Sequence, residues 1–438
     1  MTVSNKEPIV AIVGRANVGK SSVFNAVLGR REAITEAEPG TTRDSLSAKV
    51  SWQGKDFWLV DTAGLKPAQD RFELSIQNQI AEAAAAADLV VVMTEADVPL
   101  TEEDRRVATM ALKSRRPVIL AVNKIDKNRR AALADWQKLG VKDIVATSAT
   151  QRTGLDALLD KIAASLPPAR IRQDDDRIKV SLLGRPNVGK SSLFNALAKK
   201  QQALTSEQAG TTRDVNRLSL RYQGREIELM DTAGIRRSGK IERGVEQFSV
   251  LRALAAIEDS DICLVLMDAG ELNVQLDQKI AGLVKEAGKG LVLVVSKWDS
   301  AEKDAFTHDQ ISPQIAANFE FVPWAPLIFT SAVTGQNVTK IFDLVLEIDQ
   351  NRRQRFKTSQ LNQWLQAATA EHPPAGLKNT QPKLNYIVQE DNEFPNFKVF
   401  GAHTKFLHWS YKRYLERKFR DRWPLTGTSL KFWFIEKS

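Results

Sequence analysis

The sequence predicts an α/β protein in which one domain occurs twice and is followed by a smaller, basic α/β domain. The octet Gly-Arg-Ala-Asn-Val-Gly-Lys-Ser at 14–21 returns as Gly-Arg-Pro-Asn-Val-Gly-Lys-Ser at 184–191. Each octet lies between an apolar, strand-like run (9–13 and 178–183) and a helical pattern (22–28 and 193–197). Residues 351–438 contain 16 lysine and arginine residues against 7 acidic ones, so they carry the whole net charge of +9.

A strand, a glycine-rich loop and a helix in this order form a P-loop, in which backbone N–H groups surround phosphate oxygens. The lysine is placed for the β- and γ-phosphates, and the serine hydroxyl for Mg²⁺. One octet could occur by chance, but two in matching contexts exclude chance. The predicted phosphate-binding residues are Gly14, Arg15, Ala16, Asn17, Val18, Gly19, Lys20 and Ser21, and Gly184, Arg185, Pro186, Asn187, Val188, Gly189, Lys190 and Ser191.

Composition limits the class of protein. At 438 residues the chain has room for about three domains. No apolar run is long enough to span a membrane, and the N-terminal residues are polar, without a signal-peptide core. The single cysteine, Cys263, lies in an apolar run and is interpreted as a core residue in a reducing compartment. We therefore expect a cytoplasmic protein.

The first repeat, residues 7–167, carries further motifs after its P-loop. Thr42 lies in a turn-rich segment and is expected to meet Mg²⁺ and the γ-phosphate only when that phosphate is present, as in a switch loop. Asp61 ends a strand-like run near the metal, and Gly64 can turn its N–H toward the γ-phosphate. The segment predicted to surround the γ-phosphate is Asp61, Thr62, Ala63, Gly64 and Leu65.

The nucleotide base is indicated by the end of the apolar run at 118–122. That run leads into Asn123, Lys124, Ile125 and Asp126. A carboxylate at the last position can accept two hydrogen bonds from guanine, which adenine cannot supply in that arrangement. This motif predicts GTP, and Ser148 and Ala149 are expected in the last loop that contacts the base.

The second repeat, residues 178–350, follows a short linker at 168–177 and keeps the register of the first as far as Asp231; its guanine motif comes three residues later than this offset predicts. Thr212 and Asp231 lie 170 positions after Thr42 and Asp61. The segment at the γ-phosphate is Asp231, Thr232, Ala233, Gly234 and Ile235; the guanine motif is Ser296, Lys297, Trp298 and Asp299; and the last base loop contains Ser331 and Ala332. Many GTPases carry a glutamine where Leu65 and Ile235 stand, to orient the attacking water. These apolar side chains cannot do so.

The basic domain, residues 351–438, mixes predicted helices (359–365, capped by Ser359, and 410–420) with strands (383–388, 397–400 and 430–435). It contains 15 of the chain's 31 aromatic residues. Cations could bind phosphates and rings could stack on bases, which fits RNA. The alternative is that most of these rings form the core of a small domain. No Gly-x-x-Gly loop occurs here, so ordinary KH-type recognition of a single strand does not follow.

The segments 231–240 and 244–254, together with the tandem motifs, resemble the bacterial tandem-domain GTPase family Der (EngA), of the TrmE-Era-EngA-like group. The resemblance covers nearly the whole chain. It implies two Ras-like domains, a C-terminal KH-like domain, GTP hydrolysis to GDP, and a role in maturing the large (50S) ribosomal subunit. It also implies that Asn17 and Asn187 help to bind a K⁺ ion that stimulates hydrolysis. Ser296 departs from the family's asparagine, so we expect a weaker brace between this loop and the P-loop, with guanine still read by Asp299. The linker is also shorter than is usual in the family.

Together these observations predict a monomeric GTPase that acts on the large ribosomal subunit and its precursors, with the basic domain on rRNA. Lys20 and Lys190 would stabilise charge on the γ-phosphate, with catalytic contributions from Asn17, Thr42, Asn187 and Thr212. Mg²⁺ would be held by Ser21, Thr42, Ser191 and Thr212, and supported through water by Asp61 and Asp231. Two alternatives are an RNA-binding scaffold stabilised by bound nucleotide, and a tRNA-modification GTPase. The latter has a C-terminal cysteine motif and one GTPase domain, neither of which this sequence shows.

Overall fold

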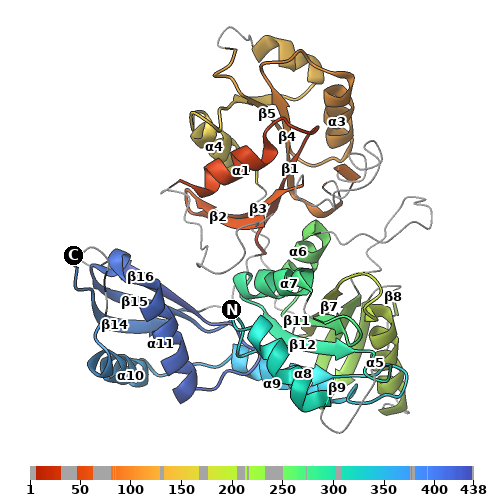
Figure 1. The fold of residues 1–438 in the computed structure, drawn as a ribbon, viewed down its shortest axis with the longest axis vertical. Coiled ribbons are helices and arrows are strands. Elements are labelled where there is room, and N and C mark those ends of the chain that lie inside the picture. Colours follow the sequence, from red (N-terminus) through yellow and green to blue (C-terminus); the bar gives the residue numbers. More distant parts are fainter. Residues whose placement is uncertain are drawn as a thin grey trace. The chain divides into compact units, whose positions relative to one another are not determined.

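The computed structural model describes residues 6–30, 47–62, 80–128 (without 82 and 84), 133–166, 176–204, 213–214, 217–231, 250–300 (without 273) and 307–436 (without 375, 377–379 and 392). The chain divides into two units, which are described separately (Figure 1). One contains the first sheet, and the other contains the second and third sheets. No helix among these residues is long and apolar enough to cross a membrane.

The first unit is a parallel α/β sheet with one antiparallel edge strand. Its order is β2-β3-β1-β4-β5-β6, and β2 runs antiparallel to β3. The strands are β1 (Ile9–Val13), β2 (Ser47–Trp52), β3 (Lys55–Asp61), β4 (Leu89–Glu95), β5 (Val118–Asn123) and β6 (Asp143–Ala146). The helices are α1 (Lys20–Leu28), α3 (Glu102–Lys113), η2 (Leu133–Leu139) and α4 (Leu155–Ser165). The central strands β1 and β4 are buried along their whole length, which explains why they read as continuous apolar runs.

The second sheet repeats this arrangement in the order β13-β12-β11-β7-β10-β9-β8. Its strands are β7 (Ile178–Gly184), β8 (Arg213–Asp214), β9 (Arg217–Tyr222), β10 (Arg225–Asp231), β11 (Ile262–Asp268), β12 (Gly290–Ser296) and β13 (Leu327–Phe329). Its helices are α5 (Lys190–Leu204), α7 (Gln275–Glu286), α8 (Thr307–Asn318) and α9 (Lys340–Arg352), and the chain forms α6 (Val250–Glu258) between β10 and β11. The predicted fold, two P-loop GTPase sheets and a third small domain, is confirmed. Cys263 is fully buried in β11, and burial raises the pKa of its thiol to about 12.

The C-terminal domain has a three-stranded sheet in the order β14-β15-β16 and two main helices. Its elements are α10 (Thr358–Glu371), β14 (Lys383–Gln389), β15 (Asn396–Ala402), η4 (Thr404–Phe406), α11 (Trp409–Arg422) and β16 (Lys431–Glu436). The predicted strands and helices are confirmed, but the prediction that Ser359 caps the first helix is wrong. The helix α10 begins one residue before Ser359, its N-cap is Lys357, and no side chain caps it. Ser359 therefore belongs to the first turn of the helix.

Most aromatic side chains of this domain do form its core, as the structural alternative predicted. Phe397 and Phe419 are completely buried, with ring centroids 4.8 Å apart. Phe356, Trp364 and Trp423 pack around them. Two rings of the domain, Tyr386 and Trp409, are instead exposed at 45% and 44% of their surfaces.

The C-terminal domain is hydrogen-bonded to the start of β12 in the second GTPase sheet. Gly290 forms a β-bridge with Thr428, and the N–H of Leu291 donates to the Gly427 carbonyl at 2.8 Å. The Ser429 hydroxyl donates to the Lys289 carbonyl at 3.0 Å. The other end of β12 is Ser296, so one strand connects this contact to the predicted guanine motif.

Candidate nucleotide-binding sites

Each P-loop lysine lies folded over its own loop. Lys20 Nζ donates to the carbonyl oxygens of Gly14 at 2.7 Å and Arg15 at 2.6 Å. Lys190 Nζ donates in the same way to Gly184 at 3.0 Å and Arg185 at 2.7 Å. Both side chains are buried, and both ammonium groups are held at the loop that is expected to surround a phosphate.

The backbone of both loops requires glycine. Gly19 and Gly189 both have φ of +93°, in the left-handed region that L side chains rarely adopt. A Cβ atom on Gly14 would lie 2.5 Å from the Met93 carbonyl oxygen. Gly19 is the N-cap of α1 and provides no side-chain cap, so the first amide groups of the helix are available to an anion.

A hydroxyl and a carboxylate meet beside each lysine, where Mg²⁺ is expected. The Ser21 hydroxyl donates to Asp61 Oδ2, and the Ser191 hydroxyl donates to Asp231 Oδ2 at 3.0 Å. Oxygen donors suit Mg²⁺, which usually keeps several waters and binds phosphate oxygens as well. The described residues contain no group of three or more metal-ligating His, Cys, Asp or Glu side chains. The serine and aspartate fit a metal ion that binds together with a nucleotide.

In the first guanine motif, Asn123 connects three segments. Its Nδ2 donates to the Val18 carbonyl in the P-loop at 2.9 Å. Its Oδ1 accepts from the N–H of Ala149 at 3.3 Å and from the Thr147 hydroxyl at 3.4 Å. The side chain is 2% exposed, so this amide fixes the distance between the P-loop and the last base loop.

Ser296 keeps one half of this connection and loses the other. Its hydroxyl contacts the Val188 carbonyl, the counterpart of Val18, and also the Met267 carbonyl at 2.9 Å. A hydroxyl has a single proton, so it cannot donate fully to both carbonyls. Within the part of the chain that the structure describes, Ser296 has no hydrogen bond to Ser331 or Ala332.

The carboxylates that are expected to read guanine remain available. Asp126 is partly exposed and Asp299 is exposed, and neither forms an ion pair or side-chain hydrogen bond that involves a described residue. The preceding lysines, Lys124 and Lys297, both have positive φ, of 60° and 54°. Ile125 and Trp298 donate backbone hydrogen bonds to Thr147 and Thr330. The base loops therefore have the same backbone path in the two repeats.

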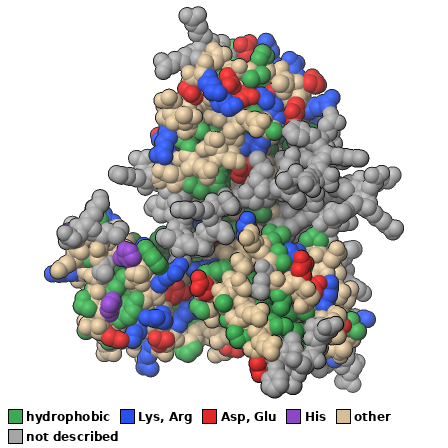
Figure 2. Space-filling model, in the orientation of Figure 1, with side chains coloured by type: hydrophobic (Ala, Val, Ile, Leu, Met, Phe, Trp, Pro, Cys, Tyr) green, Lys and Arg blue, Asp and Glu red, His purple; other side chains and the backbone are tan. Residues whose placement is uncertain are grey.

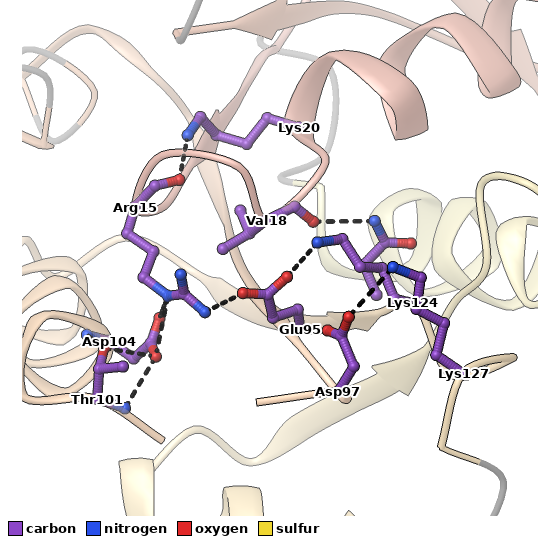
Figure 3. A network of polar contacts seen from close by, with 10 residues as sticks. Arg15, Val18, Lys20, Glu95, Asp97, Thr101, Asp104, Lys124 and Lys127 are labelled. Atoms are coloured by element: carbon purple, nitrogen blue, oxygen red, sulfur yellow. Dashed lines mark hydrogen bonds and ion pairs between the residues drawn. The ribbon is translucent and has the colours of Figure 1, made fainter. Parts of the chain in front are cut away.

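An ionic network behind the first P-loop was not predicted from the sequence (Figure 3). Arg15 Nε donates to Asp104 Oδ1 at 3.2 Å, and its NH2 group pairs with Glu95. The second oxygen of Glu95 pairs with Lys124 of the guanine motif. Asp104 also completes a capping box with Thr101 at the start of α3. The Thr-Glu-Glu-Asp sequence at 101–104 was the signal that could have located it.

The second site distributes the same charges differently. Arg185 Nε donates to Asp277 at 3.1 Å, and its NH1 donates to Glu271 at 2.6 Å. Lys297 pairs separately with Asp268 at 2.7 Å. Burial raises the pKa of Asp277 to about 6, although Arg185 opposes this shift.

Asn17 and Asn187 have the same unusual conformation. Their φ values are 66° and 63°, and both residues are exposed at the tip of the loop. Asparagine tolerates this left-handed region better than most residues. Each side-chain amide is free of hydrogen bonds to the described residues and could ligate an ion.

Several predicted site residues lie outside the described residues: Thr42, Ala63, Gly64 and Leu65 in the first repeat, and Thr212, Thr232, Ala233, Gly234 and Ile235 in the second. Thr62 is described and fully buried, and its hydroxyl donates to the Ile12 carbonyl at 2.7 Å. The other predicted P-loop residues lie in the described loops between strand and helix: Arg15, Ala16, Val18, Pro186 and Val188. Both valines belong to the hydrophobic cores of their domains.

Comparison with known proteins agrees with this geometry. A family described as "50S ribosome-binding GTPase" matches residues 9–124 and again 179–297. A second family, "KH-domain-like of EngA bacterial GTPase enzymes, C-terminal", matches residues 355–434. GTPase Der of Chloroflexus aggregans is 42% identical over 434 residues, 97% of both chains. This chain belongs to the GTPase Der family.

Other relatives show the same full-length similarity. GTPase Der of Herpetosiphon aurantiacus is 42% identical, over 97% of this chain and 96% of the relative. GTPase Der of a Geobacillus species is 40% identical, over 97% and 98%. The chain is thus a GTP-binding GTPase with a KH-like domain, and GTP, GDP and Mg²⁺ are the ligands that this family implies.

Proposed function

We propose that the protein is a ribosome biogenesis factor that hydrolyses GTP during assembly of the large (50S) ribosomal subunit and contacts rRNA. One observation carries the proposal: both nucleotide domains match the family described as 50S ribosome-binding GTPases. The charge distribution supports it, because the net +9 lies entirely within residues 351–438. On the visible face of the first unit, by contrast, acidic and basic side chains are intermingled (Figure 2).

In the proposed site, the P-loop amides and Lys20 or Lys190 bind the β- and γ-phosphates. Ser21 or Ser191, with Thr42 or Thr212, would ligate Mg²⁺, and Asp61 or Asp231 would support it. When bound, Mg²⁺ would supply positive charge that offsets the charge on the transferred phosphate. Asp126 and Asp299 accept hydrogen bonds from guanine, and Ser148–Ala149 and Ser331–Ala332 complete the base sites.

We further propose that K⁺ stimulates hydrolysis. Leu65 and Ile235 cannot orient the attacking water, so another source of charge near the phosphates is needed. The exposed amides of Asn17 and Asn187 stand at equivalent points of the two loops and offer an oxygen ligand for a monovalent cation. This is the proposed replacement for the missing glutamine.

The proposed domains are 7–167 and 178–350 for the GTPases, 168–177 for the linker and 351–438 for the KH-like domain, in a monomeric cytoplasmic protein. The contact with rRNA is proposed for the KH-like domain. Its helix α11 exposes Lys412, Arg413 and Arg417. The Arg413 guanidinium lies 4.9 Å from the ring centroid of the exposed Trp409. Such charges can bind phosphates, and the binding should weaken steeply with salt.

The test is charge reversal on α11. The variant Lys412→Glu, Arg413→Glu, Arg417→Glu should lose co-sedimentation with large-subunit precursors while GTP binding is retained. Reversal of Arg105, Arg106 and Lys113, which are exposed on α3, changes the net charge equally and is the control. Point variants are preferable to removal of the domain, because removal would break its hydrogen bonds to Lys289 and Leu291. Equal sedimentation of both variants would contradict an rRNA contact through α11.

A further inference from the structure

Among the described residues, the helices of the KH-like domain pack on one face of its sheet, the covered face, and we call the opposite face the open face. The helices α10 and α11 share a hydrophobic core with the sheet, and Figure 1 shows both beside it. Alternation along the strands places Phe397 and Val399 on the covered face, together with Phe432 and Phe434 from β16. All four belong to the hydrophobic core or pack against it.

The strand register identifies what lies on the opposite face. Tyr386 pairs with Phe400 and Lys383 with Ala402 between β14 and β15, across a bulge after Leu384. Lys398 pairs with Trp433, and Asn396 with Lys431, between β15 and β16. Each strand thus contributes one ring and one lysine to this face. We call these six residues the open-face platform: Lys383, Tyr386, Lys398, Phe400, Lys431 and Trp433.

None of the six platform residues is buried, and none of the platform rings belongs to the hydrophobic core. Tyr386 is 45% exposed, and its ring centroid lies 6.4 Å from that of Phe400. Lys431 Nζ lies 4.0 Å from the centroid of the Trp433 ring. Packing explains the rings on the covered face, but it does not explain three neighbouring rings on this one. Tyr386 is exposed and Phe400 and Trp433 are partly exposed, and apolar side chains grouped on a surface in this way mark binding sites.

The charge of the platform selects the ligand. None of the positions on this face of the three strands is acidic. Glu390, which follows β14, pairs with Lys398 at 2.5 Å at the edge. Rings between lysines provide stacking surfaces for bases and cations for a phosphate backbone, which suits unpaired RNA. A duplex hides its base faces, so it could use the lysines but not the rings.

We propose that the open-face platform is a stacking site for unpaired nucleotides of RNA, separate from the exposed cations of α11. The inference rests on the proposed function, because it assigns a site and a ligand class to the rRNA contact. It also supplies a single-strand binding mode that does not need the Gly-x-x-Gly loop, which residues 351–438 lack.

The test measures binding of the full-length protein, with GDP present, to a labelled twelve-nucleotide oligouridylate and to an RNA duplex of equal length. Tyr386→Leu and Trp433→Leu should each weaken binding of the single strand about tenfold and leave duplex binding unchanged. Phe321→Leu is the control, since it removes a partly exposed ring from the second GTPase domain instead of from the sheet. It should change single-strand affinity less than twofold. Trp433→Phe keeps a stacking ring and should retain most of the affinity.

The possible outcomes separate this inference from the proposed function. If Tyr386→Leu and Trp433→Leu bind the single strand as the unaltered protein does, the proposal for the platform is wrong. The proposed rRNA contact through α11 would not be affected. An equal loss for single strand and duplex, or a loss with Phe321→Leu as large as with Trp433→Leu, would also overturn the platform. If the unaltered protein binds neither oligonucleotides nor large-subunit particles, the proposed function itself fails. Thermal unfolding of each variant verifies that the domain remains folded.

Discussion

The two GTPase sites of this chain agree where phosphate is expected and differ where the base is expected. Lys20 and Lys190 make the same two carbonyl contacts, and each P-loop serine meets its aspartate. Asn123, however, connects the P-loop to the last base loop, whereas Ser296 reaches only the P-loop side of that connection. The contacts around the expected phosphate are thus the same in the two sites. Around the expected base, the second site lacks one side-chain hydrogen bond but keeps the backbone conformation of the loop.

The ion pairs beside the two P-loops also differ, and again the first site has the more connected arrangement. In the first site, Glu95 lies between Arg15 and Lys124, so one carboxylate connects the P-loop to the guanine motif. In the second, Arg185 and Lys297 have separate partners, Glu271 and Asp268. The first site is therefore connected at two points and the second at one. Four experiments test this difference between the two sites.

The largest effect is expected from the guanine carboxylates. Asp126→Asn or Asp299→Asn should weaken GTP binding at the altered site on the order of a hundredfold or more, because an amide N–H faces the donors of guanine. Binding of XTP should improve at the same site. Titration with fluorescent GTP and XTP, with the other domain unaltered as the internal control, measures both effects. Unchanged GTP affinity in Asp299→Asn would contradict the placement of 296–299 against the base.

The shared carboxylate comes next. Glu95→Gln removes a buried carboxylate that pairs with both Arg15 and Lys124, and Arg15 then keeps only its pair with Asp104. The loss should destabilise the first domain by about 2 kcal/mol. Asp268→Asn, whose lysine partner is 42% exposed, should cost the second domain less than about 1 kcal/mol. Hydrogen exchange of peptides from β1 and β7 reports each domain separately. Equal protection losses in the two domains would show that the shared contact adds nothing.

Replacing Na⁺ by K⁺ at constant ionic strength should raise GTP turnover on the order of tenfold, through charge stabilisation near the phosphates. Asn17→Ala and Asn187→Ala should each remove the stimulation in one domain only. Asp126→Asn and Asp299→Asn backgrounds, which silence one domain toward GTP, allow the two rates to be measured separately. Equal turnover of the unaltered protein in the two salts would exclude K⁺ as the replacement for the missing glutamine.

The smallest effect is expected from exchanging Asn123 and Ser296, the first residues of the two guanine motifs. Asn123→Ser removes the acceptor for the Ala149 N–H and should weaken GTP binding in the first domain about fivefold, the value of one hydrogen bond. Ser296→Asn should strengthen binding in the second domain by no more than the same factor. There is room for the longer side chain. Even if Gly189 carried a Cβ atom, that atom would lie 3.8 Å from the Ser296 hydroxyl oxygen. A loss of affinity in both exchanges would mean that each loop is adapted to its own residue.

Much of the fold could be predicted because the sequence repeats its own signals. Apolar runs such as 9–13 and 178–183 became strands buried along most of their length, and the glycine-rich octets became loops between strand and helix. The cap at Ser359 was wrong because a serine near a helix start can lie inside the first turn as easily as before it. Only the backbone decides between these positions.

The residues of the sequence motifs could be predicted, because each motif position has one role. The ion pairs between residues far apart in the sequence could not. Glu95 and Asp104 lie 80 and 89 positions from Arg15, so no local pattern connects them. The divergence at Ser296 was visible, but not that its hydroxyl would still reach Val188. The division of the C-terminal rings between core and open face depends on strand register, which the sequence of aromatic residues does not contain.

The hydrogen bonds between β12 and the segment 427–429 limit how this protein can be recombined. A KH-like domain transplanted onto an unrelated GTPase at residue 351 would bring Thr428 and Ser429 but not the backbone of 289–291 to which they bond. The second GTPase domain, separated at the same point, would be left with an unpaired strand end. The unit of exchange is therefore the second GTPase domain and the KH-like domain together, and a chimaera should be joined within 168–177 instead.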